Sequence, residues 1–158
     1  METGHTSGAG FNLIASAVDG QRRLIAVVMG ADSPKGREQQ AAKLLHWGQQ
    51  NFDTVQILHN GKKVGTERIW YGDKEQVKLG TDQDFWLALP KAEVPNIKAK
   101  YVLDKKELEA PIAAHQRVGE IQLYDRDKVV AHWPLVTLEA VDKGGLFSRL
   151  SDYLHHTL

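Results

Sequence analysis

The stretch ETGHTSGAGFNLIASAVDGQRRLIAVVMGAD, residues 2–32, predicts the first part of the fold. It contains two apolar runs rich in β-forming residues, joined by the turn-like Val18-Asp19-Gly20-Gln21 and preceded by a loop rich in threonine and glycine. Apolar residues of the first run alternate and share one face of a strand: Phe11, Leu13, Ala15 and Ala17. The second run, residues 24–29, is apolar at every position, which is typical of a strand covered on both faces. We therefore predict a β-hairpin with partners above and below it.

A helix is predicted directly after the hairpin. Ser33 suits the N-cap position and Pro34 the first helical position. The following residues place one apolar stripe at three- and four-residue spacing: Ala41, Leu44, Leu45, Gly48 and Phe52. We expect this helix to lie on one face of the hairpin. From Asp53 the apolar pattern changes to a period of two, so we predict a domain boundary near Asp53-Thr54.

Residues 54–141 contain a succession of short strands separated by turn signals. The strongest hairpin signal is Asn60-Gly61, between strand-like segments at 55–58 and 62–70, because this dipeptide suits a type I′ turn. The spacing of the strands predicts a compact antiparallel sandwich or barrel. Four aromatic residues fall on alternating strand positions and are expected in its core: Trp70, Trp86, Tyr101 and Trp133.

Residues 142–158 return to a helical period. One face of the predicted helix is apolar and carries Leu146, Phe147, Leu150, Tyr153 and Leu154, while Ser148, Arg149 and Asp152 lie opposite. One hypothesis is a peripheral membrane or partner contact, weak because the charges of Arg149 and Asp152 cancel. The alternative is a terminal helix that docks on its own β domain or frays. The chain is thus predicted to be α+β, with parts at 1–53, 54–141 and 142–158.

Composition excludes several classes of function. Lys+Arg and Asp+Glu number 20 each, so no basic field exists to hold nucleic acid. The chain has no cysteine, and its seven histidines show no metal-ligand spacing, so we expect neither a metal site nor another cofactor. The pair Gly8-x-Gly10 lacks the third glycine and the preceding strand of a nucleotide-binding loop. No leader follows Met1, and no run approaches the ~20 apolar residues that span a bilayer.

The motif Glu2-Thr3-Gly4-His5-Thr6 at the start of a strand resembles the Lys-Thr-Gly motif of the low-molecular-mass penicillin-binding proteins. Further segments resemble the C-terminal part of the same family, and more narrowly its 6b-type serine D-alanyl-D-alanine carboxypeptidases: Lys35-Gly36-Arg37-Glu38, Leu-Leu-x-Trp-Gly at 44–48, Trp-Tyr-Gly-Asp-Lys at 70–74 and Gly-Gly-Leu-Phe at 144–147. The resemblance implies that residues 1–53 are part of a transpeptidase-like α/β peptidase domain and that 54–141 are an all-β C-terminal domain.

The resemblance also implies an activity and partners. Family members form an acyl-enzyme through a serine and remove the terminal D-alanine of peptidoglycan stem peptides, and they bind β-lactams. By the resemblance, Thr3 would hydrogen-bond the substrate carboxylate, Gly4 and His5 would line the cleft, and Arg37 would approach the same carboxylate. The backbone N–H of His5 would supply half of an oxyanion hole. The expected location is the periplasmic face of the bacterial inner membrane, or the cytoplasm if Met1 is the true start.

This sequence departs from the family pattern at the catalytic positions. It contains neither Ser-x-x-Lys nor Ser-x-Asn, and Glu2 stands where the family has lysine. The match begins at Met1 in the middle of a motif, which indicates a C-terminal fragment, and we expect it to be inactive alone. The alternative function is a non-enzymatic β domain for membrane or protein contact. For Thr3 and His5 the alternative is a frayed N-terminal loop, and for Arg37 an ordinary exposed arginine.

Overall fold

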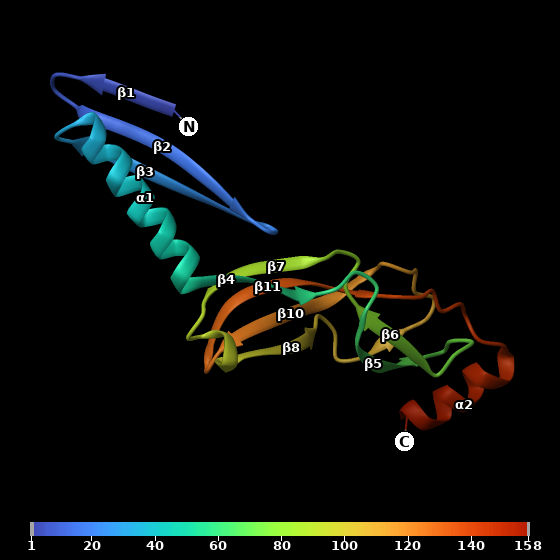
Figure 1. The fold of residues 1–158 in the computed structure, drawn as a ribbon. Helices are drawn as coiled ribbons and strands as arrows, with labels where there is room; N and C mark the ends of the chain where they lie inside the picture. Colours follow the sequence, from blue (N-terminus) through green and yellow to red (C-terminus); the bar gives the residue numbers. More distant parts are fainter. Residues whose placement is uncertain (1, 158) are drawn as a thin grey trace. The chain divides into compact units, whose positions relative to one another are not determined.

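The computed structural model describes residues 2–157 (Figure 1). Contacts between backbone positions divide the chain into two compact units. Unit 1 consists of Met1–Val55 with Leu87–Val94, and unit 2 of Gln56–Trp86 with Pro95–Leu158. The α+β class predicted from the sequence is confirmed.

Unit 1 contains an antiparallel sheet in the order β1-β2-β3. Its strands are β1 (Glu2–Thr6), β2 (Gly10–Asp19) and β3 (Arg22–Ala31). Asp19 pairs with Arg22, so the β2–β3 turn is Gly20-Gln21, one residue later than predicted, and Gly20 takes the positive φ of +60° that such tight turns need. Residues 2–6 form a third strand paired with β2, as expected from the motif at the start of a strand and not from the threonine- and glycine-rich loop.

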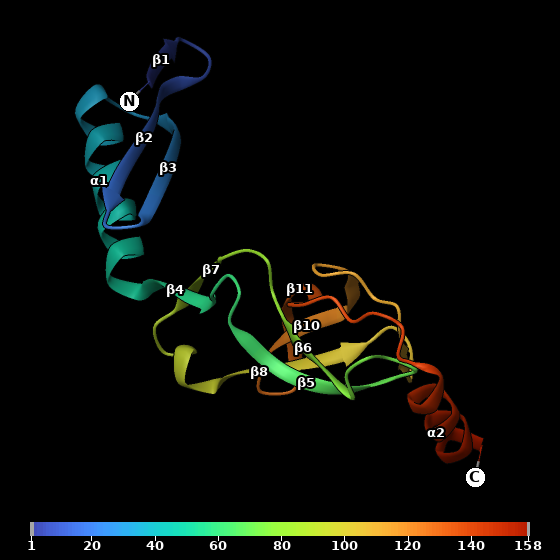
Figure 2. The same ribbon diagram turned by 90° about the vertical axis from the view of Figure 1, so that its right-hand side faces the viewer.

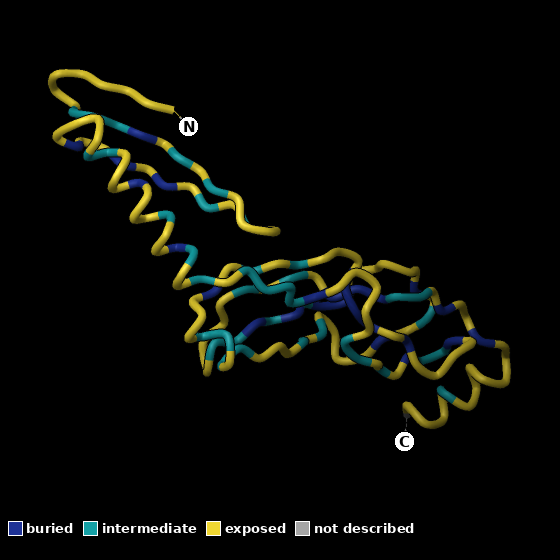
Figure 3. Tube along the Cα trace, viewed as in Figure 1, coloured by how far each residue is buried: buried dark blue, intermediate teal, exposed yellow. Residues whose placement is uncertain are grey.

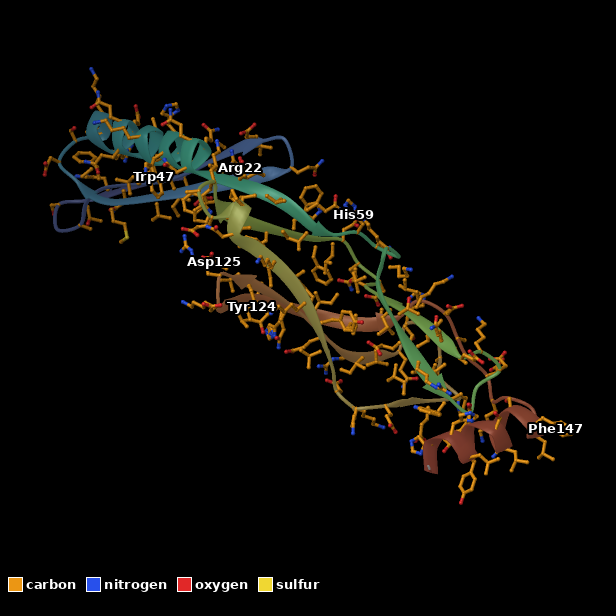
Figure 4. The ribbon with its side chains drawn as sticks, turned by 90° about the horizontal axis from the view of Figure 1, so that it is seen from below. Arg22, Trp47, His59, Tyr124, Asp125 and Phe147 are labelled. Atoms are coloured by element: carbon orange, nitrogen blue, oxygen red, sulfur yellow. The ribbon has the colours of Figure 1, made fainter. Side chains whose placement is uncertain are left out.

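Helix α1 (Pro34–Asn51) begins where its sequence predicts. The backbone N–H of Gly36 donates to the Ser33 hydroxyl at 2.9 Å, which satisfies one free donor of the first turn. The apolar stripe predicted for this helix ends one member earlier than expected. Its last member, Phe52, is the C-cap and the first residue of β4 (Phe52–Leu58). Arg22, drawn beside this end of the helix in Figure 4, donates to the carbonyl of Phe52 and to that of Gln49, and so joins the β2–β3 turn to the end of α1.

Among residues 2–157, only one face of the sheet in unit 1 is covered. Helix α1 packs on the face that carries Leu13, Ala26 and Val28, and Leu13 is 2% exposed (Figures 1 and 3). The opposite face holds exposed apolar side chains: Ile14, Val18, Ile25, Val27 and Met29. The prediction that β3 is covered on both faces is therefore wrong for the residues described, although its composition suits a strand of that kind.

Unit 2 is built on a six-stranded sheet in the order β8-β10-β11-β6-β5-β9, in which only the β5–β9 pair is parallel (Figure 2). The strands are β5 (Lys63–Trp70), β6 (Gln76–Gly80), β8 (Ile97–Leu103), β9 (Leu108–Glu109), β10 (Arg117–Asp125) and β11 (Lys128–Thr137). A short 3₁₀ helix, η1 (Val94–Asn96), precedes β8. Buried aliphatic side chains fill the core, among them Ile69, Val77, Leu79, Ile121 and Leu135.

The predicted pairing of residues 55–58 with 62–70 is wrong. Strand β4 pairs instead with β7 (Phe85–Pro90) in a two-stranded ribbon, whose residues divide between the two units. Asn60-Gly61 still forms a turn, in which the N–H of Lys62 donates to the carbonyl of His59. Only Gly61 has a positive φ, of +72°, whereas a type I′ turn needs positive φ at both residues.

The aromatic residues of unit 2 lie in different surroundings. Tyr101 and Trp133 pack against the core, as predicted, whereas Trp86 is 46% exposed and does not belong to it. Gly65 leaves room for the ring of Tyr101, since a Cβ there would come within 2.6 Å of it. The Tyr101 hydroxyl donates to the Glu67 carboxylate at 2.8 Å, and this hydrogen bond, together with burial, raises the pKa of Tyr101.

Candidate functional site

Strand β1 carries most of the predicted site residues at the edge of the sheet in unit 1. Thr3 pairs with Leu13 and His5 with Phe11, so the side chains of Thr3 and His5 lie on the face that α1 covers. Glu2 pairs with Ile14 and lies on the opposite, open face. All five residues of β1 are exposed, and β2 is its only strand neighbour among the residues described. Within residues 2–157, one edge of β1 therefore has no strand partner.

Arg37 reaches this strand from the first turns of α1. Its Nη1 donates to the carbonyl of Gly4 at 3.4 Å and to the carbonyl of Asn12 at 3.3 Å. Its guanidinium carbon lies 5.7 Å from the centre of the Phe11 ring, on which His5 stacks at 4.0 Å. The structure thus brings Gly4, His5 and Arg37 together. Within residues 2–157, the buried Nε of Arg37 has no hydrogen-bond partner.

Asn12 belongs to the same group of contacts and was not predicted. It pairs with Gly4, and its side-chain oxygen accepts a hydrogen bond from the N–H of Gly30 at 2.9 Å. This contact bridges the irregular step between β2 and β3 near Phe11. The available signal was an asparagine inside an otherwise apolar strand, where such a residue is disfavoured unless it has a specific partner.

The groups at the edge of β1 are a hydroxyl from Thr3, backbone N–H groups and the charge of Arg37. The serines whose hydroxyl contacts are resolved lie in other roles: Ser33 caps α1, Ser16 accepts from Arg23, and Ser148 contacts Gly72. No group of three or more histidine, cysteine or carboxylate side chains that could hold a metal ion occurs in residues 2–157.

A separate groove of about 550 Å³ lies between α1 and β3. Its lining is mainly apolar, from residues such as Leu24, Leu44, Trp47 and Phe52. Trp47 is drawn on α1 in Figure 4. Arginines are its charged lining groups, and no acid or base pair faces it. None of the predicted site residues lines this groove, so we do not place chemistry there.

Helix α2 (Leu146–Thr157) presents a second surface, in unit 2. Its apolar side chains point outward: Leu146, Phe147, Leu150, Tyr153 and Leu154 are exposed, Phe147 by 89%. Figure 4 shows Phe147 projecting away from the rest of unit 2. Neither helix within the described residues combines the length and the apolar character required to cross a bilayer.

The polar face of α2 contacts unit 2. Asp152 accepts a hydrogen bond from the N–H of Tyr71 at 2.8 Å and lies 3.4 Å from Arg68. His156 Nε2 lies 2.6 Å from Glu107 Oε2, and the Ser148 hydroxyl donates to the carbonyl of Gly72 at 3.3 Å. Helix α2 thus contacts its own β domain through its polar face, and its apolar face stays exposed. The Asp152 side chain is 19% exposed and pairs with Arg68, whereas Arg149 is exposed.

Comparison with protein families gives two matches. Residues 52–143 match the family described as "Penicillin-binding protein 5, C-terminal domain", and residues 1–33 match the family "D-alanyl-D-alanine carboxypeptidase". Among curated proteins, the chain is 82% identical to D-alanyl-D-alanine carboxypeptidase DacD of Salmonella typhimurium and 81% identical to DacD of Escherichia coli. Each alignment covers 99% of this chain and 40% of the relative.

Solved structures agree with these matches. Penicillin-binding protein 5 from Haemophilus influenzae aligns over 90% of this chain and 42% of its own, with a TM-score of 0.79 and 43% identity. Penicillin-binding protein 6B from Escherichia coli aligns over 87% and 33%, with a TM-score of 0.60 and 65% identity. The chain thus spans about 40% of the length of the curated relatives that it matches. It belongs to the family described as "Penicillin-binding protein 5, C-terminal domain".

Proposed function

We propose that this chain supplies the substrate-binding strand and the C-terminal β domain of a serine-type D-alanyl-D-alanine carboxypeptidase, without turnover of its own. The observation that carries the proposal is the free edge of β1, where Thr3-Gly4-His5 is held in place by the contact of Arg37 with Gly4. The ligand would be a peptidoglycan stem peptide ending in D-Ala-D-Ala, or a β-lactam. We propose the periplasmic face of the inner membrane as its location.

Each residue of the edge would have a distinct role. The Thr3 hydroxyl would donate to the terminal carboxylate of the peptide, and the N–H of His5 would donate to the oxygen that becomes negative during acyl transfer. Arg37 would favour the carboxylate by its charge and would hold β1 in position through the two carbonyls that it contacts. Glu2 would oppose an anionic ligand by ~1–4 kcal/mol at ~4 Å, depending on the effective dielectric.

The proposal assigns a different role to each of the three parts of the chain. Residues 1–53 would carry the ligand-binding part of a peptidase domain, residues 54–141 the β domain, and residues 142–158 the tail helix. No step assigned to the chain uses a metal or another cofactor.

Binding at β1 is testable by NMR titration of the ¹⁵N-labelled chain with a peptide ending in D-Ala-D-Ala. We expect amide shifts at residues 3–5, because these residues line the free edge, and none in unit 2. The same peptide ending in L-Ala-L-Ala is the matched control and should cause no shift. Arg37→Gln should weaken binding by at least about tenfold, since a hydrogen bond to a charged group contributes ~1.5–3 kcal/mol. Shifts confined to unit 2, or none at all, would contradict the assignment.

We propose in addition that α2 makes a peripheral contact with a membrane. The supporting observation is that the polar face of α2 contacts the β domain, while its five large apolar side chains are exposed to solvent. With Asp152 paired to Arg68, the outward charge near the apolar face is that of Arg149, which suits a bilayer containing anionic lipid.

Sedimentation with phosphatidylglycerol-containing vesicles checks this contact. We expect the double variant Phe147→Ser, Leu150→Ser to lower partitioning at least about tenfold, because each buried large apolar side chain contributes ~1.5–3 kcal/mol. Val129→Ser is the matched control, since Val129 is exposed elsewhere in unit 2, and it should bind as wild type does. Equal binding by wild type and the double variant would exclude α2 as the contact.

A further inference from the structure

The inward carboxylate of α2 has an unusual partner. Asp152 is 19% exposed, although it lies on a helix whose apolar side chains are mostly more than half exposed. It accepts the backbone N–H of Tyr71, the residue that follows β5 and takes a left-handed conformation with φ of +61°. Such a conformation is rare for a bulky residue and persists where the surroundings hold it. The Asp152 carboxylate therefore helps to hold the backbone of Tyr71 in this conformation.

The charge of Asp152 is compensated from the same strand. Arg68 lies 3.4 Å from the carboxylate, and its guanidinium carbon lies 3.9 Å from the centre of the Trp70 ring. The centre of the same ring lies 4.8 Å from that of the His156 ring, in an edge-to-face arrangement, and His156 is one helical turn beyond Asp152. Stacking on Trp70 orients the Arg68 guanidinium toward Asp152. The hydrogen bond between Arg68 and Asp152 is therefore strengthened by both opposite charges and a favourable orientation.

Tyr71 and α2 line one open hollow. Its volume is about 410 Å³, and its lining residues on α2 are Leu146, Phe147, Arg149, Leu150 and Tyr153. The hollow contains side chains from the end of β5 and from α2, and Asp152 connects these two elements. If α2 were released, its own apolar face would persist, but Tyr71 would no longer belong to the same surface.

We propose that Asp152 is a positioning residue, which clamps α2 to Tyr71 so that Tyr71 and the apolar face of α2 form one lipid-facing surface. The proposal rests on the membrane contact proposed above and adds its geometry. The β domain would then sit on a membrane in one orientation, with the end of β5 at the lipid surface. Without the clamp, the contacts of Ser148 with Gly72 and of His156 with Glu107 would still hold α2 to the β domain, but Tyr71 would no longer be held beside the apolar face of the helix.

The first experiment needs no lipid. Hydrogen exchange of the Tyr71 amide is measured in wild type, Asp152→Ala and the matched control Ser151→Ala, whose residue lies beside Asp152 on the helix. Asp152→Ala should lower the protection of this amide at least about tenfold, as expected for loss of a hydrogen bond to a charged group, and Ser151→Ala should leave it within about twofold. Arg68→Gln, which leaves the helix sequence unchanged, should lower it in the same direction. Unchanged protection in Asp152→Ala would overturn the clamp.

The second experiment uses bicelles of phosphatidylcholine and phosphatidylglycerol that contain a spin-labelled lipid. In wild type we expect broadening of the amide signals of Leu150, Tyr153 and Tyr71; in Asp152→Ala we expect it to persist at Leu150 and Tyr153 and to disappear at Tyr71. Broadening at Leu150 and Tyr153 with a sharp Tyr71 signal in wild type would overturn this proposal and leave the membrane contact intact. A lack of broadening at Leu150 and Tyr153 would overturn the membrane contact, and the lipid-facing surface with it.

Discussion

Gly119→Ala should lower the free energy of unfolding of unit 2 by at least about 3 kcal/mol. Gly119 is a buried residue of β10, paired with Leu103 of β8 and Leu135 of β11. A Cβ at this position would lie 2.1 Å from the carbonyl oxygen of Val102 and 2.9 Å from the Cα of Leu103. These are backbone atoms, so relief requires β8 to move away from β10. Overpacking of this kind typically costs ~1–3 kcal/mol, and loss of ladder hydrogen bonds adds to it.

Urea unfolding, followed by circular dichroism, measures the effect. We expect a loss of at least about 3 kcal/mol in the free energy of unfolding, a large share of the ~5–15 kcal/mol typical of a domain. Gly145→Ala is the matched control, because a Cβ there meets no atom within 4 Å, and it should stay within about 0.5 kcal/mol of wild type. Equal stability of Gly119→Ala and wild type would contradict the close approach of β8 and β10.

The chain should release no D-alanine from a stem-peptide mimic at a rate above that of the blank. Acyl transfer by this family's chemistry needs an attacking serine with a neighbouring lysine, and the sequence contains no Ser-x-x-Lys. In a comparable hydrolase, removal of the nucleophile costs about six orders of magnitude in rate. Donors of the oxyanion type, such as the N–H of His5, are worth about 10²–10³ each and cannot compensate.

A coupled assay for free D-alanine measures this rate, with a complete D-alanyl-D-alanine carboxypeptidase as the positive control. Glu2→Lys restores the family residue and should strengthen peptide binding, since it replaces repulsion by attraction, but it should not produce turnover. Release of D-alanine by either chain would contradict the assignment of a binding role without chemistry.

Local signals predicted local structure well. Ser33-Pro34 marks the start of α1 because the N-cap hydrogen bond and the fixed φ of proline act within one turn. The helical spacing of apolar residues over 146–154 predicted α2, because this spacing also depends only on residues within a few turns of one another. Asn60-Gly61 predicted a turn correctly, but it could not determine which strands pair across it.

Non-local pairings were not predictable from these signals. The partner of β4 is β7, which begins at Phe85, and this choice depends on packing rather than on turn chemistry. Strand β9 has two residues and pairs in parallel with β5, so it leaves no periodic pattern in the sequence. Burial of only one face of β3 likewise depends on which elements are present to cover it.

In the candidate site, too, the residues could be identified from the sequence, but their contacts with distant parts of the chain could not. Thr3, Gly4, His5 and Arg37 were found by resemblance to a motif, not by periodicity. The contact of Arg37 with the carbonyls of Gly4 and Asn12 depends on the register between β1 and β2, which sequence spacing alone does not fix. The inward turn of Asp152 depends on the conformation of Tyr71, which lies 81 residues earlier in the sequence.

In our proposal, this chain carries a ligand-binding strand of the carboxypeptidase family without the nucleophile that acylation requires. Intact-mass spectrometry after incubation with benzylpenicillin tests this most directly, because a β-lactam leaves a covalent adduct on an active serine. We expect an unmodified mass for the 158-residue chain under conditions that fully label a complete family enzyme. A mass increase equal to one penicilloyl group would contradict it.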